Sequence, residues 1–128
     1  MKLVTKELEK EFEKFPLGSQ ENLLGKAKVI AKYFNPTGVG RWYITEAKKE
    51  TNGKYLFYGY CHLGDDTCAE LGYVSQEELE NIKLPFGLGI ERDLYLDKDI
   101  TLKDALNRDG IYVPSYLCNK KKTDREER

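Results

Sequence analysis

The strongest constraint in this sequence is the Asn52-Gly53 pair, which separates two segments rich in aromatic and β-branched residues, 41–48 and 54–62. An Asn-Gly pair between two such segments favours a tight hairpin turn, because both residues tolerate the positive φ that these turns require. We therefore expect the two segments to form neighbouring antiparallel strands, so that the fold contains an antiparallel sheet.

Other segments show the patterns of further strands and helices. Alternating or short apolar runs predict strands, and Ser75 with Glu78 forms a capping box that predicts the start of a helix. The expected strands are 26–34, 41–48, 54–62, 70–74 and 90–96, and the expected helices are 5–15, 76–83 and one that begins at Thr101. Together they predict an α+β fold, an antiparallel meander sheet of about five strands with short flanking helices packed on one face or at one end.

The length of the chain fits one domain. A chain of 128 residues buries roughly two-thirds of its unfolded surface, which is enough for one hydrophobic core. Apolar residues become sparse after Pro114, and the end of the chain is mostly charged. Such a segment cannot bury enough apolar surface to offset the entropy of ordering it. We expect a single α+β domain at 1–117 and a disordered charged tail at 118–128.

Composition limits the compartment and the partners. Lys and Arg number 21 against 22 Asp and Glu, so the net charge of -1 creates no overall field that attracts nucleic acid or an acidic membrane surface. The three cysteines, Cys61, Cys68 and Cys118, are an odd number in a chain without an apolar N-terminal signal, which predicts reduced thiols and a cytoplasmic location. No apolar run approaches the ~20 residues that cross a bilayer, so we expect no membrane insertion.

Several motifs follow one another in a recognisable order. They are Trp42-Tyr43-Ile44-Thr45-Glu46, Phe57-Tyr58-Gly59-Tyr60, Glu70-Leu71-Gly72-Tyr73-Val74-Ser75 and Pro85-Phe86-Gly87-Leu88-Gly89-Ile90-Glu91-Arg92-Asp93-Leu94-Tyr95. Over about residues 27–100 the chain resembles the bacterial family named domain of unknown function 2958 (DUF2958). The resemblance implies a setting on plasmids, conjugative elements or phage-derived regions, and it implies no particular chemistry.

The segment Glu91-Arg92-Asp93 is the candidate for catalysis. In a strand its two carboxylates lie on one face about 7 Å apart, because each residue advances the chain by ~3.3 Å. With Glu46 or Glu70 from a neighbouring strand they could bind Mg²⁺ for phosphodiester chemistry. The alternative, which we favour, is a structural ion-pair cluster in which Arg92 points to the packed side of the sheet and requires a carboxylate there.

The end of the second hairpin strand and the turn that follows contain side chains of the types that bind zinc, namely Cys61, His62, Asp65 and Cys68. The gap between the two cysteines is not the spacing of a zinc finger or ribbon, and no second Cys or His pair follows. We therefore predict no metal site here and interpret the segment as the end of a hairpin with one buried cysteine.

Aromatic residues crowd three neighbouring strands, and Tyr and Trp are favoured anchors at protein interfaces. The residues that we predict to bind a partner are Trp42, Tyr43, Tyr58, Tyr60, Tyr73, Arg92 and Tyr95. An exposed aromatic sheet face can also stack single-stranded bases, although few Lys or Arg residues lie among these aromatics. Packing in the core is the competing interpretation for most of them.

Two hypotheses for the function follow. The preferred one is a non-enzymatic accessory protein of a phage, plasmid or conjugative element, without a cofactor, that binds a host or element protein and antagonises host defence. The alternative is a Mg²⁺-dependent nuclease or single-stranded nucleic-acid-binding protein that uses Glu46, Glu91 and Asp93 as its catalytic carboxylates.

Overall fold

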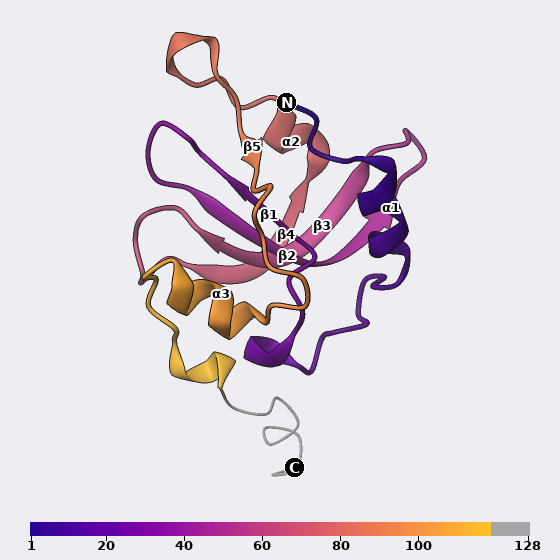
Figure 1. The fold of residues 1–128 in the computed structure, drawn as a ribbon. Helices are drawn as coiled ribbons and strands as arrows, with labels where there is room; N and C mark the ends of the chain where they lie inside the picture. The colour runs from indigo at the N-terminus through magenta and orange to yellow at the C-terminus, as the bar shows by residue number, and fades with distance from the viewer. Residues whose placement is uncertain (119–128) are drawn as a thin grey trace.

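The computed structural model describes residues 1–118, so the predicted disordered tail, apart from Cys118, lies outside the described residues. The helices are α1 (Lys6–Glu13), α2 (Gln76–Glu80) and α3 (Leu102–Arg108), with short 3-10 helices η1 (Leu24–Lys26), η2 (Pro85–Gly87) and η3 (Ser115–Leu117). The strands are β1 (Ala31–Phe34), β2 (Arg41–Lys49), β3 (Tyr55–His62), β4 (Glu70–Ser75) and β5 (Glu91–Arg92), arranged as Figure 1 shows. The predicted α+β class is confirmed.

The five strands form one sheet in the order β4-β3-β2-β1-β5, with every neighbouring pair antiparallel. The expected meander is present from β1 to β4. The last strand does not continue it, because the chain returns through α2 and η2 to the opposite edge, where β5 pairs with β1. The two edges of the sheet are therefore β4 and β5.

Helices cover both faces of the sheet, and the expectation of helices on one face or at one end is wrong. Phe12 of α1 and Leu79 of α2 pack with Phe57 on one face, which we call the α1/α2 face. Leu102 and Leu106 of α3 pack on the other, the α3 face, together with Tyr43 of β2. Because both sides of β2 are covered, consecutive residues in the middle of that strand are buried.

Two predicted strands are much shorter than expected. The segment 26–34 begins with η1 and pairs in the sheet only from Ala31, and its residues are almost all buried instead of alternating. In the segment 90–96 only Glu91 and Arg92 pair, and the chain turns directly afterwards. The carboxylate of Asp93 accepts a hydrogen bond from the Tyr95 amide at 2.8 Å, which favours a turn over a continued strand.

The predicted helix starts are confirmed by their capping hydrogen bonds. The hydroxyl of Thr5 accepts from the Leu8 amide, and the hydroxyl of Thr101 accepts from the Asp104 amide. At α2 the Ser75 hydroxyl and the Glu78 carboxylate each accept from the other residue's amide, which completes the capping box. The helices themselves are shorter than predicted, ending at Glu13 and Glu80.

The β2–β3 hairpin is confirmed, but its turn is not the two-residue type that the Asn-Gly pair suggests. The Gly53 amide donates to the Glu50 carbonyl and the Glu50 amide to the Lys54 carbonyl, which is a three-residue loop built on a β-turn. Gly53 alone takes a positive φ, 84°, whereas the Asn52 side chain accepts from the Lys54 amide. Gly53 thus provides the backbone conformation, and Asn52 provides a hydrogen bond.

A β-bulge interrupts β2 between Ile44 and Glu46. Ile44 lies opposite Gly59, but Glu46 lies opposite Tyr58, so one extra residue is inserted at Thr45. Glu46 consequently moves from the α1/α2 face to the α3 face, because a shift of one residue reverses the side to which a strand residue points.

The bulge is held by buried polar contacts with the loop before β1. The Glu46 carboxylate accepts from the amides of Gly18 and Gln20 at 2.6 and 2.8 Å. The Gln20 side chain donates to the Thr45 carbonyl at 2.7 Å and exchanges two hydrogen bonds with the Lys28 backbone. The Gly18, Gln20 and Lys28 amides and the Thr45 and Lys28 carbonyls are therefore satisfied by side chains, as buried backbone groups generally are.

None of the helices formed by residues 1–118 is long and apolar enough to cross a membrane.

The turn analysis predicts that Gly53→Val lowers the free energy of unfolding by about 1–2 kcal/mol, because a β-branched residue resists positive φ. A Cβ at this position meets no atom within 4 Å, so the loss is a backbone effect. Urea denaturation measures it, with Gly53→Asn as the matched control, since Asn tolerates the left-handed conformation. Equal stability of the two variants would show that the turn has another conformation.

The bulge analysis predicts that Gly59→Ala lowers the free energy of unfolding by about 3 kcal/mol or more, as severe overpacking does. A Cβ at Gly59 would lie 1.9 Å from the Tyr43 carbonyl oxygen. Gly72, opposite Gly59 on β4, is the control, because a Cβ there meets nothing within 4 Å. Thermal and urea unfolding of Gly59→Ala and Gly72→Ala should differ strongly, and similar values would contradict the close approach at the bulge.

Candidate binding site

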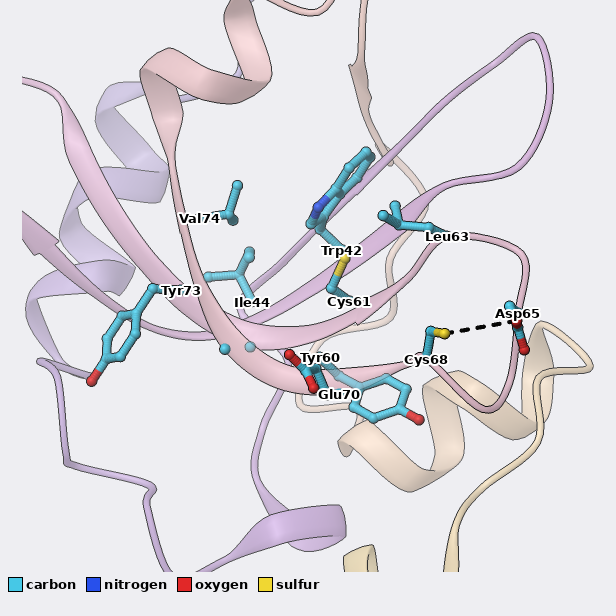
Figure 2. A pocket seen from close by; sticks show the side chains of 12 residues that line it. Trp42, Ile44, Tyr60, Cys61, Leu63, Asp65, Cys68, Glu70, Tyr73 and Val74 are labelled. Carbon is cyan, nitrogen blue, oxygen red and sulfur yellow. Dashed lines mark hydrogen bonds between the residues drawn. The ribbon is translucent and has the colours of Figure 1, made fainter.

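A hollow of about 370 Å³ opens on the α1/α2 face, above the part of the sheet formed by β2, β3 and β4. Its walls are mostly apolar and include Trp42, Ile44, Cys61, Leu63 and Val74. Figure 2 shows these side chains on one side of the sheet, while Tyr60 and Tyr73 point to the other side. A concave apolar site of this kind is suited to hold an apolar group.

Two glycines form the floor of the hollow. Gly59 and Gly72 lie opposite each other on β3 and β4. Gly59 is required by the bulge, as the 1.9 Å approach shows. Gly72 has no such requirement, because its φ is not positive and a Cβ would meet no neighbouring atom. Its missing side chain keeps the hollow open towards the β4 edge. An isolated glycine within a strand signals close approach, but the sequence analysis did not use that signal.

The polar groups beside the hollow are acidic, and the thiol of Cys61 in its wall is disfavoured as a thiolate. Glu70 and Asp65 contribute to the lining. Burial, followed by the nearby charge of Glu70, raises the pKa of the Cys61 thiol. A raised pKa disfavours the thiolate that nucleophilic or redox chemistry requires.

The residues weighed for zinc do not converge. The imidazole of His62 is held by Asp66, at 2.7 Å from Nε2, and Nδ1 accepts from the Gly64 amide. The Cys68 thiol instead donates to the Asp65 carboxylate at 3.7 Å. Within residues 1–118 no group of three or more His, Cys, Asp or Glu side chains could hold a metal ion.

The seven predicted partner-binding residues lie in different environments. Tyr43 and Tyr60 are fully buried under α3, so for these two the core interpretation is correct. Trp42 is also buried, but its ring forms a wall of the hollow. Tyr58 and Tyr73 form an edge-to-face pair on the α3 face at β4, with ring centroids 5.0 Å apart, and Tyr73 is 65% exposed.

The other two lie at the opposite edge of the sheet. Tyr95 is 87% exposed in the turn after β5. Arg92 is half-buried, and its Nε donates to the Lys2 carbonyl at 3.4 Å. The carboxylate partner expected for Arg92 is not found among the residues that the structure describes. The expectation of a buried Arg92 ion pair is therefore wrong, because a backbone carbonyl takes that place.

The three candidate catalytic carboxylates do not form one site. Glu46 is buried at the bulge and bound to the backbone amides of Gly18 and Gln20. Glu91 and Asp93 lie at the β5 edge, where Asp93 forms an ion pair with Lys32 at 3.4 Å. The strand that was predicted to align Glu91 and Asp93 ends at Arg92. The two carboxylates are therefore not held on one face of a strand, as the predicted Mg²⁺ site required.

A buried charged cluster lies between the sheet and α3. Lys32, almost fully buried, forms ion pairs with Asp109 at 2.8 Å and with Asp93, and the Tyr43 hydroxyl donates to Asp109 at 2.5 Å. Burial would raise the pKa of Asp109, but the hydrogen bonds from Lys32 and Tyr43 outweigh it and lower that pKa below its ordinary value of 3.8. Sequence reasoning placed Lys32 in an alternating strand and could not pair it with a residue so distant in the chain.

This cluster predicts that Asp109→Asn lowers the free energy of unfolding at pH 7 by about 3 kcal/mol, because it leaves the Lys32 charge buried with less compensation. Since the folded pKa of Asp109 is lowered, its contribution is present above the ordinary carboxyl range and is lost as the pH falls. Urea unfolding at pH 7 and at about pH 3 should show the difference between parent and variant shrinking in acid. A difference that stays constant with pH would contradict this role.

The comparisons with known proteins agree with the resemblance seen in the sequence. Searches of curated proteins and of solved structures found no match. The family model described as protein of unknown function (DUF2958) matches residues 3–108, which include β1 to β5, α1 to α3 and the hollow. The chain therefore belongs to the DUF2958 family.

Proposed function

We propose that this protein is a non-enzymatic binding module that holds an apolar side chain of a partner protein in the hollow on the α1/α2 face. The supporting observation is Gly72. Neither its φ nor its surroundings require glycine, yet any side chain there would project into the hollow. A strand normally gains stability from a larger residue at such a position, so the glycine serves the opening itself.

The chemistry of the lining supports binding more than catalysis. The apolar walls offer contact area, and the raised pKa of Cys61 disfavours a thiolate nucleophile. The neighbouring carboxylates Asp65 and Glu70 would repel phosphate groups, which favours a protein partner over nucleic acid at this place.

We extend the proposal to the biological setting. The partner is a host or element-encoded protein in the cytoplasm, and the binding module acts as an accessory protein of a phage, plasmid or conjugative element that antagonises host defence. The support is the resemblance to a family associated with such elements, together with the free thiols of Cys61, Cys68 and Cys118.

The test is retention of a partner by the parent protein and by Gly72→Leu, which fills the hollow. We expect Gly72→Leu to retain at least about tenfold less of a stoichiometric partner from bacterial lysate, since excluding one apolar side chain removes 1–3 kcal/mol of binding. Its melting temperature should be equal or higher. The tryptophan analogue N-acetyl-tryptophanamide should shift the Trp42 and Gly72 resonances of the parent in NMR spectra and leave the Trp42 resonances of Gly72→Leu unchanged.

Leu94→Ala is the matched control, because Leu94 is an exposed apolar residue in the turn after β5, at the opposite edge of the sheet, and is not among the predicted partner-binding residues. It should retain the partner like the parent. Equal retention by the parent and Gly72→Leu, with no NMR shift from the tryptophan analogue, would eliminate the hollow as the binding site.

A further inference from the structure

The edge strand β4 borders the hollow, and among residues 1–118 it pairs with β3 alone, so that its outer side has no neighbouring strand there. Three of its residues, Glu70, Gly72 and Val74, line the hollow. Exposed strand edges present backbone donors and acceptors that can pair with another chain, and folded proteins usually protect them. Whether each outward-facing amide of β4 already has a hydrogen-bond partner therefore shows where another chain could pair.

Two of these outward amides are already occupied. The Ser75 amide donates to the Glu78 carboxylate at 2.8 Å. Since alternate residues of a strand direct their amides to the same side, Leu71 and Tyr73 also face outward. The Leu71 amide interacts with the hydroxyl of Tyr116. Burial raises the pKa of this hydroxyl, although its interactions with Tyr60 and with the Leu71 backbone lower that pKa in part. Tyr73, between the two, is 65% exposed, and within residues 1–118 no hydrogen bond is found on the outward side of its backbone.

A strand added at this opening would bring side chains to the hollow. Its residue opposite Tyr73 would point to the α3 face, and the adjacent residue would point to the α1/α2 face beside Gly72. Neighbouring strands lie ~4.8 Å apart, which is within reach of a large side chain leaning over a glycine. An aromatic residue covering an edge glycine is a known way to stabilise sheet pairing. The glycine and the free amide are thus adjacent parts of one site.

The charge around this edge favours a basic occupant. Between Leu63 and Ile82 the chain carries carboxylates and no Lys or Arg, the acidic residues being Asp65, Asp66, Glu70, Glu77, Glu78 and Glu80. Of these, Glu80 is paired with Lys54, Asp66 contacts the His62 imidazole and Glu78 caps α2, so Asp65, Glu70 and Glu77 are the carboxylates that carry this argument. A second copy of the chain pairing edge to edge would bring the same carboxylates together, which is unfavourable.

From these observations we infer that β4 takes up an extended, lysine- or arginine-rich segment of the partner protein as an added strand, with an aromatic side chain of that segment lying over Gly72 in the hollow. The inference rests on the proposed binding function and specifies its partner. Main-chain hydrogen bonds at Tyr73 supply affinity, and the hollow supplies specificity, as in other cases of strand addition.

The experiment selects peptides from a random phage-displayed library on the immobilised full-length protein and measures their affinities by fluorescence anisotropy. We expect basic sequences with an aromatic residue, and weaker binding as NaCl rises from about 50 to about 300 mM. Hydrogen exchange should show protection of the Tyr73 amide in the complex. Acidic or helical selected sequences, or salt-independent binding, would overturn the inference.

Two variants isolate the backbone contact. Tyr73→Pro removes the outward N–H at a position where an edge strand tolerates proline, and Tyr73→Val removes the ring but keeps the N–H. We expect the proline variant to bind about tenfold more weakly than the valine variant, as loss of one hydrogen bond predicts. Melting temperatures check that both are folded. If the proline variant is unfolded, protection of the Tyr73 amide in the parent complex decides the question.

The outcomes separate this inference from the proposed function. Binding that is lost in Gly72→Leu but equal in the two Tyr73 variants leaves the hollow as a binding site and overturns strand addition. If no peptide is selected while retention of a partner from lysate still depends on Gly72, strand addition is likewise overturned and the hollow stays a binding site. A dimer in sedimentation that disappears in Tyr73→Pro would show that the occupant is a second copy and would also overturn the inference.

Discussion

The bulge at Thr45 is the constraint on which most of this structure depends. By inserting one residue into β2, it places Ala47 under α1 and turns Glu46 to the α3 face. There the Glu46 carboxylate binds the two amides of the loop that leads from α1 to β1, and Gln20 closes the gap in the ladder by binding the Thr45 carbonyl. Without the bulge, a buried carboxylate would point into the apolar cluster around Phe57, at a cost of several kcal/mol.

The same bulge explains why the hollow exists. The backbone of β2 approaches β3 so closely at Tyr43 that only glycine fits at position 59, and one half of the floor is therefore a by-product of folding. The other half is not. Gly72 faces open space in a regular strand, where a Cβ would meet no atom within 4 Å and where β-branched residues are generally favoured. Gly59 is therefore required by the fold, whereas the fold does not explain why position 72 is glycine.

The predictions that were correct depended on local sequence signals, and those that were wrong concerned contacts between residues distant in the chain or the exact length of an element. The capping residues Ser75 and Thr101 and the glycine of the hairpin were identified because their hydrogen bonds and dihedral angles involve only near neighbours. The bulge was missed because it follows from pairing across strands. The segment 26–34 was predicted as an alternating, half-buried strand, but Lys32 within it is buried, because Asp109 and Tyr43 form a cluster that accommodates its charge. The length of β5 was overestimated since the Asp93 side chain can bind its own backbone in a turn.

The placement of the carboxylates also bears on why the hollow, and not a charged site, is the functional candidate. Glu46 satisfies backbone amides, Asp109 compensates the charge of Lys32, and Asp93 completes that cluster, so each of these three acids, one buried and two half-buried, has a partner within the fold. A carboxylate used for metal binding or proton transfer must keep lone pairs available for a ligand. Under the proposed function, the groups that would contact a partner are the backbone of Tyr73 and the apolar walls beside Gly72, since main-chain pairing and apolar pockets are the two elements of strand addition.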